Sequence, residues 1–256
     1  MTSGTSGSTL GRLALAAAFW LVVWQLASLA VGQELLLVSP LAVLRSLADL
    51  VPTPDFWARV WHTFWRIIGG FLLALVAGSL LAALSGAFQL VRTLVAPLIL
   101  VVRSVPVVSF IILVLIWTDS GALALVISFL IALPVIHTNV LEGIDQRDPK
   151  LLEMARVFHV PRRRRLHAID LPAVLPYLQS ASRTAIGLAW KSGVAAEVIG
   201  LPDGSIGERL YQAKIFLSTA ELFSWTIVIV LLSFAFERLF VTGLRAGAGA
   251  VARWGD

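Results

Sequence analysis

Cysteine is absent from this chain of 256 residues, and histidine occurs only four times. Without cysteine there are no disulfide bonds, thiol nucleophiles or cysteine-ligated metals, and the four histidines are too scattered for a metal site. Charge is scarce too, since only 14% of the residues are Asp, Glu, Lys or Arg, against about 25% in a soluble domain. The phosphate-loop motif GxxxxGK[ST] is also missing, which excludes the nucleotide-binding loop of P-loop NTPases.

Apolar residues make up 58% of the chain, and its mean hydropathy is +0.89. Several apolar runs approach the roughly 20 residues that a helix needs to cross a bilayer. The composition therefore predicts one all-α integral membrane domain. The net charge of +5 fits a basic inner face and does not require nucleic acid as a partner. No cleaved signal peptide is expected, because the first apolar run is long and lacks a small-residue cleavage site.

Six transmembrane helices are predicted, near residues 10–32, 67–88, 94–117, 122–141, 181–200 and 221–241. The third contains Pro97 and Pro106, so we expect a bent or broken helix there. The second carries small residues that predict close helix packing, namely Gly69, Gly70, Ala74, Gly78 and Ala82.

The segment between the first two spans predicts two shorter helices. Ser39 and Pro40 mark the start of an amphipathic helix over 39–51, and Asp55 is expected to cap a second helix. The second helix carries tryptophans at four-residue spacing, which places Trp57, Trp61 and Trp65 along one stripe. We interpret this stripe as an interfacial aromatic anchor, with recognition of a partner on the outer face as the alternative.

Lys and Arg are distributed asymmetrically about the six spans. One side has fourteen of them and the other has five, with Lys191 left out because it lies within a span. The positive-inside rule therefore predicts that both termini and the loop 142–180 are cytoplasmic. The expected organisation is a disordered tail at 1–9, a first span with outer amphipathic helices at 10–66, a core at 67–242 that includes the loop 142–180, and a cytoplasmic tail at 243–256.

The loop 142–180 has an ordered pattern of its own. Asp148 and Pro149 predict the start of a short helix, and Val160-Pro161 predicts its end. Four arginines follow, and an apolar stretch then leads to Pro172 and back into the membrane. Because a fully solvated loop does not need two apolar faces, we interpret this one as a docking element.

The same loop resembles the cytoplasmic coupling loop of bacterial ABC importer permeases, whose motif is Glu-Ala-Ala, three residues, Gly, nine residues, Ile, one residue, Leu-Pro. Met154 replaces the first Ala and His159 replaces the Gly, so we expect the turn to come from Pro161. The matching positions are Glu153, Ala155, Ile169, Leu171 and Pro172. Segments such as RSVPVVSFIILVLIW and LEGIDQRDPKLLEMAR are similar to the nitrate, sulfonate, taurine and bicarbonate branch of this family.

The resemblance implies a type I ABC importer permease fold in the bacterial inner membrane. Two permeases, expected to be identical, would form the pathway, with the coupling loops seated on ABC ATPase subunits that bind ATP and Mg. An extracytoplasmic solute-binding protein would deliver the solute, and the permease itself would have no catalytic residue and bind no cofactor or metal. The implied ATPase-coupling residues are Glu153, Met154, Ala155, His159, Ile169, Leu171 and Pro172.

The resemblance also implies roles for single residues of the loop. Glu153 would orient the loop by hydrogen bonding, and Ala155 would allow close approach to the ATPase. The basic run has two interpretations, namely contact with membrane lipids together with topology, or salt bridges to the ATPase. It consists of Arg162, Arg163, Arg164 and Arg165.

Lys191 and Glu197 lie inside the fifth predicted span, beside Trp190. A charge within a membrane is costly, so it should face protein or water. Six residues of helix separate the two charges by roughly 600°, so they do not share a face unless Gly193 interrupts the helix. Since this span lines the pathway in the resembled family, Trp190, Lys191 and Glu197 are candidate pathway residues. Alternatively, each charge pairs with another helix, or Glu197 lies at the outer boundary.

His137 and Asn139 are further candidate pathway residues, because they place polar groups near the inner end of the fourth span. Hydrogen bonding between helices is the alternative interpretation of both.

The sequence thus favours an ATP-driven importer of a small anion of the nitrate, sulfonate, taurine or bicarbonate type. A thiamine-precursor-like or other small organic solute is the alternative for the same machinery. An ion-coupled secondary transporter should show inverted repeats and buried acidic relays, and a lipid-modifying enzyme should show a cluster of reactive side chains. None of these features is evident.

Overall fold

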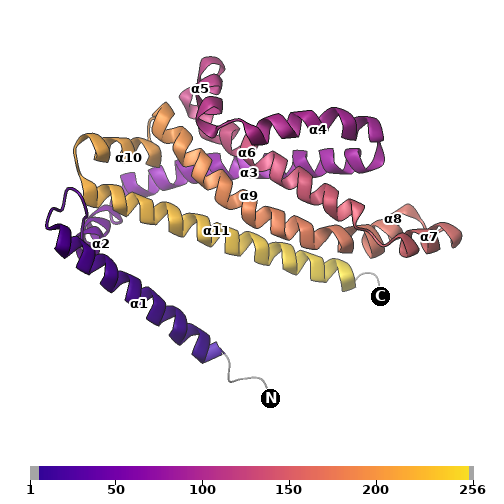
Figure 1. The fold of residues 1–256 in the computed structure, drawn as a ribbon, viewed down its shortest axis with the longest axis horizontal. Coiled ribbons are helices and arrows are strands. Elements are labelled where there is room, and N and C mark those ends of the chain that lie inside the picture. The colour runs from indigo at the N-terminus through magenta and orange to yellow at the C-terminus, as the bar shows by residue number, and fades with distance from the viewer. Residues whose placement is uncertain (1–5, 254–256) are drawn as a thin grey trace. The chain divides into compact units, whose positions relative to one another are not determined.

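The computed structural model describes residues 6–253, and these form helices joined by short connections (Figure 1). Contacts divide the chain into two compact units. One contains the residues up to Ala58 together with Arg209–Val228, and the other contains Arg59–Glu208 and the residues from Ile229 onward. The elements are α1 (Ser6–Val31), α2 (Pro40–Leu50), α3 (Pro54–Ala87), α4 (Gln89–Ser104), α5 (Val107–Trp117), α6 (Ser120–Asp145), α7 (Pro149–Val157), α8 (Arg162–Arg165), η1 (Leu166–Asp170), α9 (Leu171–Gly200), α10 (Ile206–Ile215) and α11 (Thr219–Arg253).

The first unit contains α1, α2 and the first turns of α11. Ser39 caps α2 as predicted, because its Oγ accepts a hydrogen bond from the Ala42 N–H at 3.2 Å, and Pro40 follows it. Ser224 on α11 donates a hydrogen bond to the Val43 carbonyl of α2 at 3.2 Å. Polar contacts to backbone carbonyls thus join the helices of this unit.

Helix α3 corrects the expectation of separate helices on either side of Arg66. It runs for 34 residues without interruption, so the expected boundary at 66 lies inside it. Asp55 does not cap the helix, since Thr53 does so by accepting a hydrogen bond from the Phe56 N–H at 3.3 Å. Asp55 forms an ion pair with Arg209 at 2.7 Å instead.

The tryptophan stripe on α3 lies at the surface of the chain. Trp57, Trp61 and Trp65 are 57%, 63% and 61% exposed. The rings of Trp61 and Trp65 stack with their centroids 5.7 Å apart. Indoles in a surface stripe fit both interpretations given above.

The second unit is built around α6 and α9, which pack along one another, with α3 against them (Figure 1). Gly70 of α3 allows this approach, because a Cβ there would collide with the backbone of α6 at Leu125. Ala74 and Ala82 are fully buried. The predicted close packing through small residues is therefore confirmed.

The third predicted span is broken, as expected. Helices α4 and α5 meet at an angle of 105° across Val105-Pro106. Pro106 has no N–H and disfavours a helical conformation in the residue before it, so Val105 is extended, with ψ 132°. Pro97 lies inside α4 and does not end it.

Within residues 6–253, four helices are long and apolar enough to cross a membrane, and a fifth span results if the bent α4–α5 pair is counted. Helix α9, which covers the fifth predicted span, is not among them and carries Arg183, Lys191 and Glu197. The count of six spans therefore stays a prediction. At the chain ends, α1 begins at Ser6 and α11 continues to Arg253, so part of each expected tail is helical and the rest lies outside the described residues.

Candidate functional site

Helix α7 forms the first arm of the predicted coupling loop. Asp148 caps it as predicted, accepting a hydrogen bond from the Lys150 N–H at 2.8 Å. The helix ends at His159, whose backbone is left-handed with φ +50°. There the His159 N–H donates to the Arg156 carbonyl at 3.2 Å, and the Val160 N–H donates to the Ala155 carbonyl at 2.9 Å. This pair of bonds is the Schellman motif, which glycine usually ends.

The turn in the loop thus occurs at His159, which corrects the expectation that Pro161 supplies it. A non-glycine residue fits there because the two terminal hydrogen bonds offset the unfavourable backbone conformation. Pro161 instead precedes the four residues of α8.

The second arm of the loop does not break before it returns to the main helices. Helix α8, the π-helical turn η1 and α9 follow one another without a gap from Arg162 to Gly200. The Leu171 N–H donates to the Leu166 carbonyl, which is the five-residue spacing of a π turn. Such a turn accommodates Pro172, which has no N–H to donate. The Leu-Pro pair therefore lies within a continuous helix.

Asp170 joins the two arms, and sequence reasoning missed it. Its carboxylate contacts Arg147 Nη1 at 2.6 Å and Arg165 Nε at 3.3 Å. Arg147 lies between α6 and α7 and also donates to the Ile144 carbonyl at 2.6 Å. An acidic residue directly after Ile169, in so basic a loop, was the available signal.

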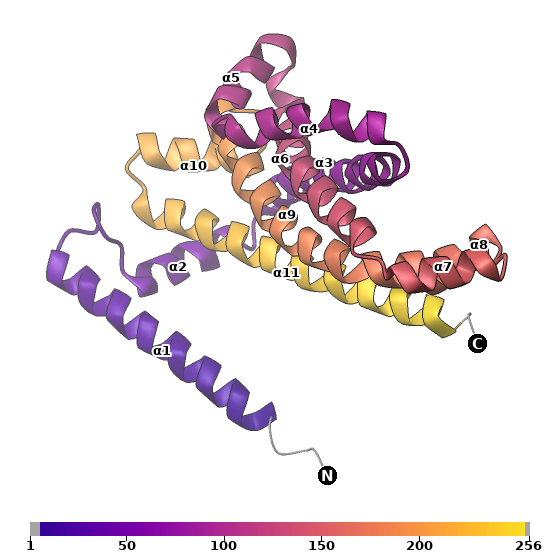
Figure 2. The ribbon, with the colours of Figure 1, turned by 45° about the vertical axis from the view of Figure 1, so that its right-hand side comes forward.

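The outer side of the loop carries exposed apolar side chains. Figure 2 shows α7 and α8 beyond the ends of α6 and α9, within the second unit. Met154, Val157 and Phe158 are 43%, 65% and 75% exposed, and Glu153 lies exposed among them. We call these four residues the coupling surface. Such a cluster at a helix end is typical of a protein contact.

The other predicted coupling residues divide into exposed and buried sets. Ala155 and Ile169 are buried, so the expected close approach at Ala155 is to the chain itself. Within residues 6–253 the Glu153 side chain has no hydrogen-bond partner, so its expected role in orienting the loop stays a prediction. The exposed set is Met154, His159, Arg162, Arg163, Arg164, Leu171 and Pro172, while Arg165 is half-buried against Asp170.

Glu197 is fully buried and binds two other helices. Its Oε2 accepts hydrogen bonds from the Thr63 hydroxyl of α3 at 2.8 Å and from the Gly207 N–H of α10 at 3.2 Å. Of the alternatives, pairing with another helix is the one found. Helix α9 runs through Gly193 without interruption, so Glu197 does not meet Lys191.

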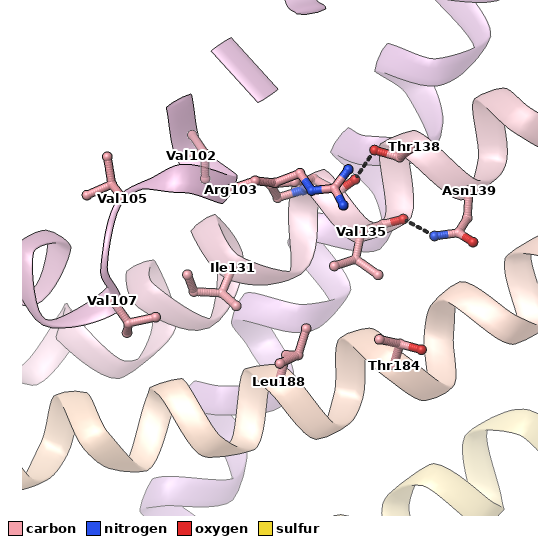
Figure 3. A pocket seen from close by; sticks show the side chains of 11 residues that line it. Val102, Arg103, Val105, Val107, Ile131, Val135, Thr138, Asn139, Thr184 and Leu188 are labelled. Atoms are coloured by element: carbon pink, nitrogen blue, oxygen red, sulfur yellow. Dashed lines mark hydrogen bonds between the residues drawn. The ribbon is translucent and has the colours of Figure 1, made fainter. Parts of the chain in front are cut away.

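Lys191 is exposed, and Trp190 beside it is buried. Leu188 and Thr184 lie three and seven residues before Lys191 on α9, so they are on the same face of the helix as Lys191. This face borders a cavity of about 430 Å³ that opens between α6, α9 and the α4–α5 break (Figure 3).

Most residues that line this cavity are apolar. Its polar lining side chains are Arg103, Thr138, Asn139 and Thr184, and for these we call it the polar cavity. Figure 3 shows Arg103 reaching from α4 towards α6, where Thr138 and Asn139 lie. His137 is not part of the lining, because it is buried and its Nε2 lies 3.3 Å from the Ser85 hydroxyl of α3. Of the two candidates on α6, Asn139 therefore borders the cavity and His137 joins helices.

Comparison with known proteins identifies the family. Residues 70–244, more than half of the chain, match the model described as "Binding-protein-dependent transport system inner membrane component". An amino acid ABC transporter crystallised with histidines shares the fold, with a TM-score of 0.59, 18% identity, and coverage of 80% of this chain and 97% of that one.

Curated relatives are similar over most of their length. The putative aliphatic sulfonates transport permease SsuC of Bacillus subtilis is 27% identical, over 81% of this chain and 76% of the relative. The nitrate import permease NrtB of Synechococcus elongatus is 28% identical, over 76% and 73%. The taurine transport system permease TauC of Escherichia coli is 25% identical, over 96% and 89%. The chain therefore belongs to the inner membrane components of binding-protein-dependent transport systems: it is a multi-pass, non-catalytic permease subunit of an ABC importer, in which the ATPase partner binds ATP.

Proposed function

We propose that this permease imports a small anion of the nitrate, sulfonate, taurine or bicarbonate type, delivered by an extracytoplasmic binding protein. The names of the relatives support this class, since sulfonates, nitrate and taurine appear in them. Two positively charged side chains also support an anionic substrate, namely Arg103 at the polar cavity and Lys191 on the same α9 face as Thr184. A thiamine-precursor-like solute is the second candidate for the same machinery, although no acidic side chain that would attract a cationic ring lines the cavity within residues 6–253.

We propose that the coupling surface contacts the ATPase, and the proposed function as an ATP-driven importer depends on this contact. Glu153, Met154, Val157 and Phe158 expose apolar area around one carboxylate, on a short helix held to the core by the Asp170 ion pairs. A rigid element with an exposed apolar centre is suited to transmit movement from a partner. Arg162, Arg163 and Arg164 extend the surface and would contact the ATPase or the anionic inner leaflet.

The proposed topology has six spans with both termini in the cytoplasm. Helix α9 is then the fifth span despite its charges, since Glu197 Oε2 is hydrogen-bonded to α3 and α10 inside the protein and Lys191 would face a water-accessible pathway. Two identical copies would enclose the pathway. A secondary transporter is disfavoured because Glu197, which would have to serve as an acidic relay, instead holds helix ends together.

The substitution Glu153→Lys tests the coupling assignment in the complex that copurifies with the ATPase and binding protein. Reversing the charge at the centre of the surface should leave membrane insertion unchanged and lower substrate-stimulated ATP hydrolysis and uptake by about tenfold or more. The matched control is Glu142→Lys, an exposed glutamate at the end of α6 outside the coupling surface. Undiminished uptake and ATPase stimulation in Glu153→Lys would remove this surface from the coupling mechanism.

A further inference from the structure

We propose that the polar cavity is a transit site for oxyanions and that the positively charged Arg103 side chain binds them there. The inference rests on the proposed function and assigns the anion a place within the pathway. Arg103 is the one charged side chain among the lining residues. No carboxylate within residues 6–253 forms an ion pair with it. The Arg103 side chain is exposed at the edge of the cavity, so its guanidinium is accessible to an anion that enters from solvent.

The hydrogen bonds around the cavity leave Arg103 as its main free donor. The Thr138 hydroxyl donates to the Pro134 carbonyl at 2.7 Å, and the Asn139 amide N–H donates to the Val135 carbonyl at 2.8 Å (Figure 3). The Thr138 hydroxyl and one of the two Asn139 amide N–H groups are therefore occupied by their own helix. Thr184 holds the Ser180 carbonyl only loosely, at 3.4 Å, and its hydroxyl can turn to a ligand.

A planar guanidinium with several free N–H groups favours a particular ligand chemistry. It binds two oxygens of one group at once, as nitrate, sulfonate and carboxylate groups provide. The remaining lining includes Val107, Ile131 and Leu188, which would surround a short alkyl chain. The volume of about 430 Å³ is within the range of small-molecule sites.

Lys191 gives the anion a second cation along the same route. It lies seven residues beyond Thr184 on α9, which is about 10 Å along the helix axis and nearly the same face. It is outside the cavity lining, so its ammonium would attract an anion before Arg103 holds it. Two cations in series with an interval between them suit transit better than retention.

Uptake by the reconstituted complex tests the role of Arg103, with nitrate, methanesulfonate and taurine as probes. Arg103→Gln should lower uptake at least tenfold while the loaded binding protein still stimulates ATP hydrolysis. Arg103→Lys, which keeps the charge and loses the planar fork, should fall between that variant and the wild type. Arg92→Gln is the matched control on the same helix, because Arg92 pairs with Asp145 outside the cavity.

The outcomes separate the two proposals. If the wild type takes up any of the three probes and Arg103→Gln takes it up equally fast, the transit site is overturned and the proposed function is left intact. If the wild type moves none of the three anions but moves a neutral or cationic solute, the proposed function fails and the transit site with it.

A second measurement does not require an Arg103 variant to fold. The chain has no cysteine, so Thr184→Cys introduces a single thiol at the cavity. Nitrate or methanesulfonate should slow its modification by a neutral thiol reagent at least threefold, and equal concentrations of chloride should slow it less. Modification at the same rate with and without the oxyanions overturns the proposal.

Discussion

His159 holds a backbone conformation that few residues other than glycine adopt, and it does so directly after the end of α7. Two hydrogen bonds, to the Arg156 and Ala155 carbonyls, keep it there. The family motif that this loop resembles has glycine at this position, and the geometry gives the physical reason. The substitution to histidine changes the residue and preserves the turn.

We expect His159→Gly to stabilise α7 locally, by about 0.5–1 kcal/mol, because removal of the Cβ relieves the left-handed strain and outweighs the added freedom of the unfolded chain. Hydrogen exchange of the backbone amides from Ala155 to Val160 measures this local stability. The control is Arg156→Gly, one turn earlier in a right-handed conformation, which should destabilise the same amides by about 1 kcal/mol. If both variants change the local stability of these amides in the same direction, the assignment of strain to His159 is contradicted.

At the scale of elements, the parts of the fold that depend on neighbouring residues could be predicted from the sequence. The caps at Ser39 and Asp148 are local hydrogen bonds, and the break before α5 follows from Pro106. The cap at Asp55 was wrong because Thr53 competes for the same helix end and Arg209, 154 residues away, binds the carboxylate.

The candidate site was less predictable, because it depends on contacts between distant segments. Glu197 could be recognised as costly, but its partners on α3 and α10 become visible only in the folded chain. In the sequence, Arg103 is only one of the fourteen Lys and Arg residues on the predicted cytoplasmic side. Only the α4–α5 break brings it beside Thr138 and Asn139.

The α3–α6 contact yields an element-scale prediction. Gly70→Ala should destabilise the protein by about 1–3 kcal/mol, because the new methyl group would overlap the α6 backbone at Leu125, which cannot move aside. The adjacent Gly69→Ala is the control, since its Cβ would lie 3.5 Å from the end of the Leu125 side chain, an ordinary contact. Thermal unfolding followed by tryptophan fluorescence compares the two variants, and equal midpoints would show that the helices can separate without cost.

At the scale of the whole molecule, the open point is whether α9 crosses the membrane. By hydropathy alone, α9 is not among the helices that could cross the membrane. The distribution of Lys and Arg, in contrast, predicts that the residues before and after α9 lie on opposite sides of the membrane. Its polar residues explain the difference. Glu197 is buried inside the protein, where its Oε2 is hydrogen-bonded, and Lys191 faces the proposed pathway, so neither must contact lipid.

Single cysteines can be placed anywhere in this cysteine-free chain, which makes the topology testable. In intact cells, a membrane-impermeant maleimide should label Asp203→Cys and not Arg163→Cys, and inside-out vesicles should reverse the pattern. Both positions are exposed, so burial does not prevent labelling. Labelling of both from one side would show that α9 does not span the bilayer.

The uninterrupted helix from Arg162 to Gly200 has a mechanical consequence. Thr184 at the cavity lies 22 residues from Arg162, a length of roughly 33 Å at about 1.5 Å per residue. We infer that this helix can act as a lever arm: a tilt of about 10° about its Arg162 end, made as one body, would displace the cavity wall by roughly 6 Å, comparable to the diameter of a small oxyanion. A displacement of that size would need no unfolding, and the Asp170 ion pairs hold the end of the helix that lies next to the proposed coupling surface.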